Sequence, residues 1–304
     1  MRTPLVPLEA DFGPGRIYLK LENLQPIRSF KLRGAGNALA LAGEEELREG
    51  VWTASAGNMA QAVAWHASRR RLPCTVVVPE TAPQTKLDAV ARLGARIVAV
   101  PVETWLEVFR TRKYPGMTGV FVHPFSDPNV IAGNGTIGLE IIEDLPGVDA
   151  VLVPYGGGGL CSGIASALRA LAPRCRVYAC EVETAAPLQA SLAAGEPVEV
   201  DHVPSFVDGI GAPRVFPEMF RLVRQLVEGS IVVSLDGVAA AIRLLVERAG
   251  VVAEGAGASP VAAALSGRAG SGNLVCVVSG GNIDASVLAT ILEGKTPQPG
   301  DVRT

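Results

Sequence analysis

The stretch AVLVPYGGGGLCSG, residues 150–163, joins an apolar run to four consecutive glycines and then to an Ala- and Leu-rich segment. A short apolar run that ends at a glycine turn is typical of a strand buried on both faces of a parallel sheet. The segment that follows the glycines has the composition of a helix. The stretch therefore predicts a strand, a tight turn and a helix, which is the repeating unit of parallel α/β folds.

The same alternation runs along most of the chain. β-Branched runs precede Ala-rich helix patterns at residues 16–42, 50–70, 74–94, 95–114, 119–145 and 176–195. A further apolar strand, NLVCVVSGG at residues 273–281, ends in two glycines. Repeated alternation of strands and helices predicts a doubly wound α/β architecture. The segments are not similar to one another, so a short-period repeat protein is not expected.

The composition argues against several classes of protein. The 304 residues carry a net charge of −3, without the basic surface that nucleic-acid binding requires. We find no apolar run suited to spanning a membrane and no signal peptide pattern, so we expect a cytoplasmic protein. Five cysteines without CxxC spacing predict reduced thiols, and three scattered histidines predict no histidine metal site.

The glycines at residues 156–159 predict a binding site as well as a turn. Glycine lets the backbone approach a ligand closely, and the following helix start offers N–H groups and a positive dipole end. A phosphate is the most suitable ligand. A nucleoside triphosphate is disfavoured because no Lys-Ser/Thr pair follows the glycines. The alternative is a tight turn without a ligand.

Two other strand exits carry polar groups. SAGN, residues 55–58, ends a strand and opens a helix, so its N–H groups suit a carboxylate. From these residues alone an ordinary helix-capping loop is an equally good interpretation. VSGGN, residues 278–282, offers the hydroxyl of Ser279, which can donate or accept a hydrogen bond.

Lys31, within IRSFKLRGAG at residues 27–36, is one of only five lysines. It stands at a predicted helix start, where positive potential and burial would lower the pKa of an amine. An unprotonated amine is a nucleophile that forms Schiff bases with aldehydes. A solvated surface lysine is the alternative for this residue alone. Together, however, an amine, a phosphate loop and a carboxylate loop are what a pyridoxal phosphate (PLP) enzyme acting on an amino acid requires.

Seven motifs occur in the order found in one enzyme family: SFKLRGAGNAL, SAGNMAQAVA, GGGGL, GNGTIGLE, DGIG, AEGAGA and VSGGNID. From about residue 4 to residue 291 the chain resembles the serine/threonine dehydratases, which include threonine dehydratase and serine racemase-like proteins, of the tryptophan-synthase-β-like (fold type II) PLP superfamily. The resemblance implies two doubly wound open-sheet α/β domains with PLP in the cleft between them. The large domain would comprise residues 1–43 and 128–304, and the small inserted domain residues 44–127.

The resemblance also implies a role for each motif residue. Lys31 would form the Schiff base with PLP, and Phe30 would pack near the ring. Asn58 would bind the phenolic oxygen of PLP and Ser279 its pyridine nitrogen. The phosphate would be held by Gly156, Gly157, Gly158, Gly159 and Leu160. The substrate carboxylate would be held by Ser55, Ala56, Gly57 and Asn58, and the site would also be lined by Gly209 and Glu254.

The implied reaction is α,β-elimination from a small hydroxy amino acid. L-Threonine would give 2-oxobutanoate and L-serine pyruvate, each with ammonia. A neutral hydroxyl such as that of Ser279 stabilises a protonated pyridine poorly, which favours elimination over reactions that need a long-lived carbanion. The resemblance further implies a homodimer or homotetramer.

The sequence departs from the family pattern at several positions. Met59 replaces a histidine of the carboxylate loop, so substrate affinity is expected to differ. Ala56 stands where serine racemases have a second serine, which makes racemisation less favourable. Glu181 matches one ligand of a divalent cation site, but Pro187 replaces the aspartate, so we expect no metal or a monovalent cation. Because the chain ends at Thr304, we expect no regulatory domain and no feedback inhibition by isoleucine.

Three alternatives stay open. The first is a serine racemase or a 3-hydroxyaspartate dehydratase. The second is a dinucleotide-binding oxidoreductase, with the glycines at the pyrophosphate and Glu181 or Glu183 at the ribose; this leaves Lys31, Asn58 and Ser279 without roles. The third is a relative that has lost its activity, against which the intact lysine argues.

Overall fold

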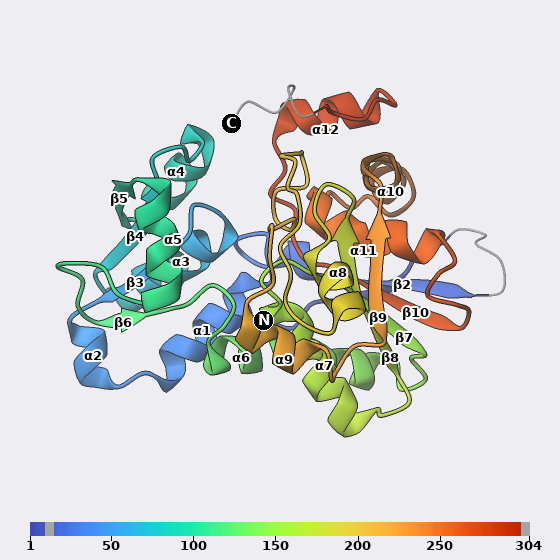
Figure 1. Ribbon diagram of the computed structural model, residues 1–304, viewed down its shortest axis with the longest axis horizontal. Coiled ribbons are helices and arrows are strands. Elements are labelled where there is room, and N and C mark those ends of the chain that lie inside the picture. Colours follow the sequence, from blue (N-terminus) through green and yellow to red (C-terminus); the bar gives the residue numbers. More distant parts are fainter. Residues whose placement is uncertain (10–14, 299–304) are drawn as a thin grey trace. The chain divides into compact units, whose positions relative to one another are not determined.

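The computed structural model describes residues 1–9 and 15–298 of the chain. Thr304, on which the expectation about a regulatory domain rests, lies outside these residues. The described chain divides into two compact units, one of residues 1–30 and 135–298 and the other of residues 31–134. Each unit is built on one sheet, and its strands and helices alternate along the sequence (Figure 1).

The sheet of the first unit has the order β1 (Leu5–Pro7), β2 (Arg16–Leu21), β10 (Asn273–Val278), β7 (Ala150–Pro154), β8 (Arg176–Val182) and β9 (Gly229–Val233). β1 and β2 pair antiparallel, and all other neighbours pair parallel. Every residue of β7 is buried, as the continuous apolar run at residues 150–154 predicted. β7, which lies between β10 and β8, leads into the glycine loop.

The helical elements of this unit are η1 (Glu22–Leu24), most of α6 (Pro128–Asp144), α7 (Gly159–Leu171), α8 (Pro187–Ala194), α9 (Pro217–Val223), α10 (Leu235–Ala249), α11 (Gly255–Leu265) and α12 (Ala285–Leu292). α11 packs against β7, β8, β9 and β10 and against α10. Ten of its residues, from Gly255 to Ala264, are buried. A helix that is apolar on all sides is expected to be enclosed in this way.

The sheet of the second unit has the order β5 (Arg96–Val100), β4 (Cys74–Pro79), β3 (Val51–Ala54) and β6 (Val120–Phe121), and its strands are parallel. Its helices are α1 (Lys31–Leu41), α2 (Glu44–Arg48), α3 (Asn58–Arg70), α4 (Gln84–Ala91) and α5 (Val102–Thr111). α1 packs against α3, where His66 Nε2 donates to the Leu32 carbonyl oxygen at 2.9 Å. The compact unit therefore includes α1. The domain boundaries implied by the family resemblance stay a prediction.

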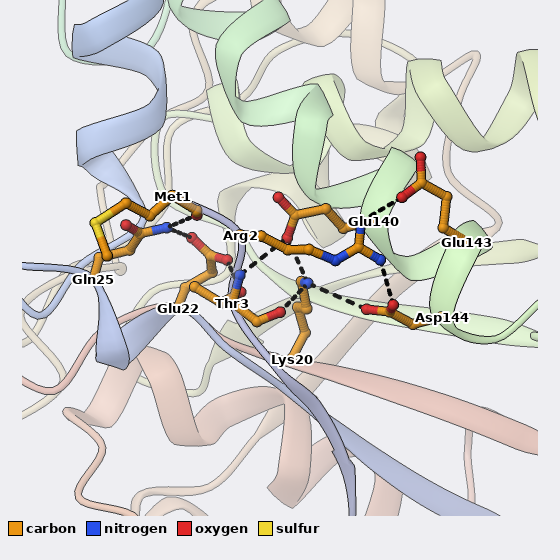
Figure 2. A network of polar contacts seen from close by, with 9 residues as sticks. All are labelled: Met1, Arg2, Thr3, Lys20, Glu22, Gln25, Glu140, Glu143 and Asp144. Atoms are coloured by element: carbon orange, nitrogen blue, oxygen red, sulfur yellow. Dashed lines mark hydrogen bonds and ion pairs between the residues drawn. The ribbon is translucent and has the colours of Figure 1, made fainter.

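A polar network joins the N-terminal residues to β2 and α6 within the first unit (Figure 2). Lys20 is fully buried, and its Nζ lies 2.6 Å from Glu140 Oε2 and 3.8 Å from Asp144 Oδ2. The same nitrogen donates to the Thr3 carbonyl oxygen at 2.7 Å. The Thr3 hydroxyl donates to Glu22 Oε1 at 2.5 Å. The network satisfies a buried charge with both carboxylate and backbone acceptors, as burial of a charge requires.

These observations confirm the predicted α/β fold class. The helix predicted near residues 29–42 begins at Lys31, and the helix predicted at residues 58–70 occupies those residues. Across the part of the chain that the structure describes, no helix combines the length and the apolar character needed to cross a membrane.

Candidate active site

The glycine loop, residues 156–159, links β7 to α7. Gly158 precedes the first residue of α7 and has φ +86°, a left-handed conformation that glycine adopts readily. A Cβ at Gly156 would lie 3.2 Å from the carbonyl oxygen of Gly209. Because the N-cap residue has no side chain, the first N–H groups of this 13-residue helix remain available for a ligand. The loop therefore has the close backbone approach and the uncapped helix start that the predicted anion site requires.

Contacts within the same unit run from the glycine loop to Gly209, from Gly209 to Glu254, and from Glu254 to the loop after β10. A Cβ at Gly209 would lie 3.7 Å from Glu254 Oε1. The Glu254 N–H donates to the Gly280 carbonyl at 3.0 Å, and the Asn282 N–H donates to Glu254 Oε2 at 3.2 Å. Ser279, which follows β10, is buried with 2% of its surface exposed. The structure thus gathers the first unit's predicted site residues around Glu254.

The residues that lead into Lys31 pair with this loop. The Phe30 N–H donates to the Ser279 carbonyl at 2.9 Å, and the Gly281 N–H donates to the Arg28 carbonyl at 2.9 Å. Arg28 has φ +57°, and a left-handed conformation costs a residue with a Cβ about 1–2 kcal/mol. The backbone pairing offsets this cost. It fixes the point at which the chain turns into α1.

Lys31 is the first residue of α1 and is partly buried. Its Nζ donates to the carbonyl oxygen of Pro124 at 2.7 Å. Pro124 belongs to the turn HPFS, residues 123–126, which connects β6 to α6. The sequence analysis gave this turn no role. A His-Pro pair at a strand exit was the signal that could have drawn attention to it.

The loop at residues 55–58 lies between β3 and α3. The Ser55 N–H donates to the Val77 carbonyl at 3.1 Å, and the Ser55 hydroxyl accepts from the Gly57 N–H at 3.2 Å. Asn58 is the first residue of α3, so the loop presents a helix start, as predicted. Met59 is only 1% exposed, and its side chain therefore belongs to the core and not to the loop surface.

Glu181 is buried at the end of β8. Its Oε1 accepts from the Leu188 N–H at 2.8 Å, and its Oε2 accepts from the Gln189 N–H at 2.8 Å and from the Ser230 hydroxyl at 2.6 Å. Burial raises the pKa of this carboxyl group. The carboxylate thus caps the first turn of α8. Within the described ranges, no group of three or more His, Cys, Asp or Glu side chains is arranged to hold a metal ion.

The five cysteines are free thiols, and four of them are buried. Burial raises the pKa of Cys74 and of Cys161 to about 12, and it raises that of Cys175 to about 11. These thiols are therefore protonated at neutral pH and are poor nucleophiles. The prediction that most of the cysteines are buried is confirmed.

The predicted site residues form two groups, one within each unit. The first contains Phe30, the glycine loop with Leu160, Gly209, Glu254 and Ser279. The second contains Lys31 and the loop of Ser55, Ala56, Gly57 and Asn58. Lys31 follows directly on Phe30 in the chain, so the two groups meet at one peptide bond.

A family described as pyridoxal-phosphate dependent enzymes matches residues 1–280, and the chain belongs to this family. It is 44% identical over 282 residues to an L-threonine ammonia-lyase of Thermotoga maritima, covering 91% of this chain and 70% of that protein. It is 38% identical over 303 residues to the L-threonine dehydratase catabolic TdcB of Staphylococcus aureus, covering 96% of this chain and 87% of the relative.

Solved structures agree with this assignment. The processed form of threonine deaminase isoform 2 from Solanum lycopersicum matches with a TM-score of 0.86 and 35% identity, over 96% of this chain and 88% of that one. Maize serine racemase matches with a TM-score of 0.85 and 33% identity, over 97% and 92% of the two chains. The predicted family is confirmed. The oxidoreductase alternative is wrong.

The residues present fit the cofactor of this family. The site offers a primary amine at Lys31, a helix start without a side-chain cap, and the buried hydroxyl-bearing Ser279. Tyr155 Oη is buried next to Gly158, where a Cβ would lie 3.0 Å from it. Among the described residues this oxygen has no hydrogen-bond partner. An oxygen-rich anion at the glycine loop is a group that would supply one.

Proposed function

We propose that the protein is an L-threonine ammonia-lyase that also accepts L-serine. The observation that carries this proposal is the similarity to L-threonine ammonia-lyases over most of the chain. The two groups of site residues support it, because they provide an amine, an anion cradle and a second helix start for a carboxylate.

When bound, PLP supplies an aldehyde for the amino group and an electron-withdrawing ring that acidifies the α-carbon. The residues proposed to hold it are Lys31 at the aldehyde and the glycine loop with Leu160 at the phosphate. Asn58 is proposed to bind the phenolic oxygen, and Ser279 the pyridine nitrogen. Phe30, Gly209 and Glu254 are proposed to surround the ring.

The substrate carboxylate is proposed to bind at the loop of Ser55, Ala56 and Gly57 with Asn58. The N-terminus of α3 has a positive potential that favours a carboxylate there. Burial behind this loop would also exclude water from the reacting carbon. A substrate bound through its carboxylate holds its α-hydrogen in one orientation. One base can then remove this hydrogen.

Lys31 Nζ is the proposed base that takes the α-proton of the substrate. The bond to the β-hydroxyl then breaks, and the hydroxyl leaves as water after receiving a proton. The enamine that remains takes up one water as it is hydrolysed to the 2-oxo acid and ammonia. The net reaction of L-threonine is thus conversion to 2-oxobutanoate and ammonia, without an oxidant or reductant.

Racemisation is the second candidate, and the similarity to maize serine racemase favours it. A racemase needs a proton donor on the face of the α-carbon opposite the lysine. The family resemblance assigns that position to Ala56, whose methyl group carries no exchangeable proton. We therefore rank dehydration above racemisation.

We extend the proposal to the homodimer or homotetramer that the dehydratase resemblance implies and to the cytoplasmic location expected from the sequence. A small domain of residues 44–127 inserted into a large domain of residues 1–43 and 128–304 is part of the same proposal. A monovalent cation near Glu181 is the ion we propose, because Pro187 replaces the aspartate of the divalent site.

The experiment that tests the function is release of 2-oxo acid from L-threonine and L-serine by the purified protein with PLP. We expect 2-oxobutanoate and pyruvate, with D-threonine unreactive as the control for specificity. If cofactor is bound but neither L-amino acid yields a 2-oxo acid, the proposal fails. Formation of D-serine in that case would support racemisation.

A further inference from the structure

The turn at residues 123–126 is built around a buried imidazole. His123 is 1% exposed. The ring centroids of Phe109 and Phe121 each lie 5.9 Å from that of His123, and the Phe125 ring lies 4.5 Å away at an interplanar angle of 89°. Three aromatic rings therefore hold the imidazole in one orientation.

The hydrogen bonds of the imidazole define its protonation. Nδ1 accepts from the Ser126 N–H at 3.0 Å, from the Phe125 N–H at 3.3 Å and from the Ser126 hydroxyl at 3.1 Å. An acceptor at Nδ1 places the proton of the neutral ring on Nε2. A hydrogen bond to the backbone of Phe109 gives that proton a partner. The ring is thus neutral, with a single tautomer.

The surroundings also disfavour a charged imidazole. Burial lowers the pKa of His123 to about 3, with further contributions from the positive charges of Arg112 and Lys31. Arg112 Nη2 donates to both the carbonyl and the hydroxyl oxygen of Ser126 at 3.1 Å. This leaves the hydroxyl proton of Ser126 for His123 Nδ1. Ser126 is therefore hydrogen-bonded to both Arg112 and His123, which fixes the turn.

Peptide geometry connects His123 to Lys31. The peptide bonds of the described residues are trans, and in a planar trans peptide the C=O and N–H groups point in opposite directions. The peptide between Pro124 and Phe125 has its N–H directed at His123 Nδ1. Its carbonyl oxygen must therefore point away from the imidazole. On that side it accepts from Lys31 Nζ at 2.7 Å.

We propose that His123 is a positioning residue for Lys31: the neutral imidazole fixes the Pro124–Phe125 peptide plane, whose carbonyl oxygen orients the amine of Lys31. This inference rests on the proposed role of Lys31 as the cofactor lysine. A protonated His123 would present a donor to three donors, and it would place a second positive charge near Lys31. The positioning of Lys31 therefore requires a neutral His123 that accepts hydrogen bonds at Nδ1.

Three substitutions separate positioning from general stability. His123→Leu removes the acceptor. His123→Asn replaces Nδ1 by an amide oxygen that can accept from the same N–H groups, and its NH₂ group can donate. Thr53→Val is the matched control: the Thr53 hydroxyl is buried and donates to the Val122 carbonyl at 2.7 Å, next to the turn but not on the peptide that faces Lys31.

The measurement is the rate at which the full-length protein, freed of cofactor, captures added PLP covalently at Lys31. Samples are reduced with borohydride at intervals, and the modified Lys31 peptide is quantified by mass spectrometry. Because misplacing a reacting group by about 1 Å can cost roughly 100-fold in rate, we expect His123→Leu to slow capture about 10- to 100-fold. We expect His123→Asn and Thr53→Val to stay within about 3-fold of the parent protein.

Equal rates for His123→Leu and the parent, or equal slowing by His123→Leu and Thr53→Val, would overturn the proposal. If His123→Leu does not fold, the rate of PLP capture by Arg112→Met is measured instead. Arg112 is exposed and acts on the turn through Ser126. Slower capture by Arg112→Met supports the proposal, and an unchanged rate overturns it. Failure of the parent protein to capture PLP at Lys31 instead contradicts the proposed function itself.

Discussion

Lys20 and Lys31 are two of the five lysines, and their surroundings differ in kind. Lys20 is fully buried in β2, where two carboxylates and a backbone carbonyl lie within 4.0 Å of its Nζ (Figure 2). Lys31 is partly buried at the start of α1, and Pro124 gives it a neutral carbonyl acceptor. One lysine has its charge balanced by acids. The other has a partner that accepts a hydrogen bond without a charge.

The difference teaches what each lysine can do. A buried ammonium between carboxylates is held in place, because removing its proton would leave the acids without their counter-charge. It ties chain segments together. A backbone carbonyl acceptor orients an amine without adding a charge beside it. Lys20 is thus suited to structure and Lys31 to chemistry.

The largest expected effect is the loss of turnover when Lys31 is replaced. Lys31→Ala should abolish turnover, since a positioned base alone contributes about 100- to 10,000-fold. The visible absorbance of the bound cofactor should be lost as well. Lys20→Met, which removes the other buried amine, should keep both signals in the folded protein. Measurable turnover in Lys31→Ala, or its specific loss in Lys20→Met, would show that the roles are wrongly assigned.

The second effect is on stability and concerns Lys20. Removing one partner of a buried ion pair costs about 3–5 kcal/mol, so Lys20→Met should lower the free energy of unfolding by that order. Urea denaturation followed by circular dichroism measures the change. Arg2→Ala is the matched control, because Arg2 contacts Glu143 and Asp144 of the same network from the surface, and it should shift the midpoint far less.

The double variant Lys20→Met with Glu140→Leu should recover part of the loss, because it removes the carboxylate left without its ammonium. A Lys20→Met protein as stable as the parent would mean that the network contributes little.

The smallest of the three effects is a pH dependence of folding stability, which comes from His123, the residue proposed to position Lys31. The pKa of His123 is about 3 in the folded protein and about 6.5 in the unfolded chain, so between these values only the unfolded chain binds the proton. The folded state therefore loses stability as the pH falls below 6.5. The slope is at most about 1.4 kcal/mol per pH unit, or about 2 kcal/mol by pH 5.

The difference between the parent and His123→Asn isolates this contribution, because His66 and the carboxylates titrate in both proteins. Thermal melting from pH 7 to pH 5 should show the two stabilities converging as the pH falls. Parallel pH profiles would contradict a neutral, buried His123.

The sequence was most informative where one strand passes into one helix. The all-apolar β7 and the glycines after it predicted the glycine loop, and SAGN predicted the start of α3. Short or mixed elements gave weaker signals. β1, β9, α2, α9, α10, α11 and α12 were not predicted. β1, β9, α2 and α9 are only three to seven residues long, and α11 is buried throughout, so these elements lack a clear period. α10 has apolar residues at helical spacing, and this signal was missed.

The sequence did not predict the contacts that orient the site residues. Lys31 and Pro124 are 93 positions apart, and Ser279 meets Phe30 from the far end of the chain. Glu181 was weighed as a metal ligand or a ribose ligand, whereas its oxygens cap α8. In each case the side-chain type was visible in the sequence. Its partner depended on how distant segments fold together.

The central claim is that Lys31 is the lysine that carries the cofactor. The direct test is to reduce the full-length protein with borohydride in the presence of PLP, digest it and locate the modified lysine by mass spectrometry. We predict modification at Lys31, with Lys20 unmodified. Modification mainly at Lys20, Lys86, Lys113 or Lys295, or none at all in protein that has bound PLP, would contradict the account.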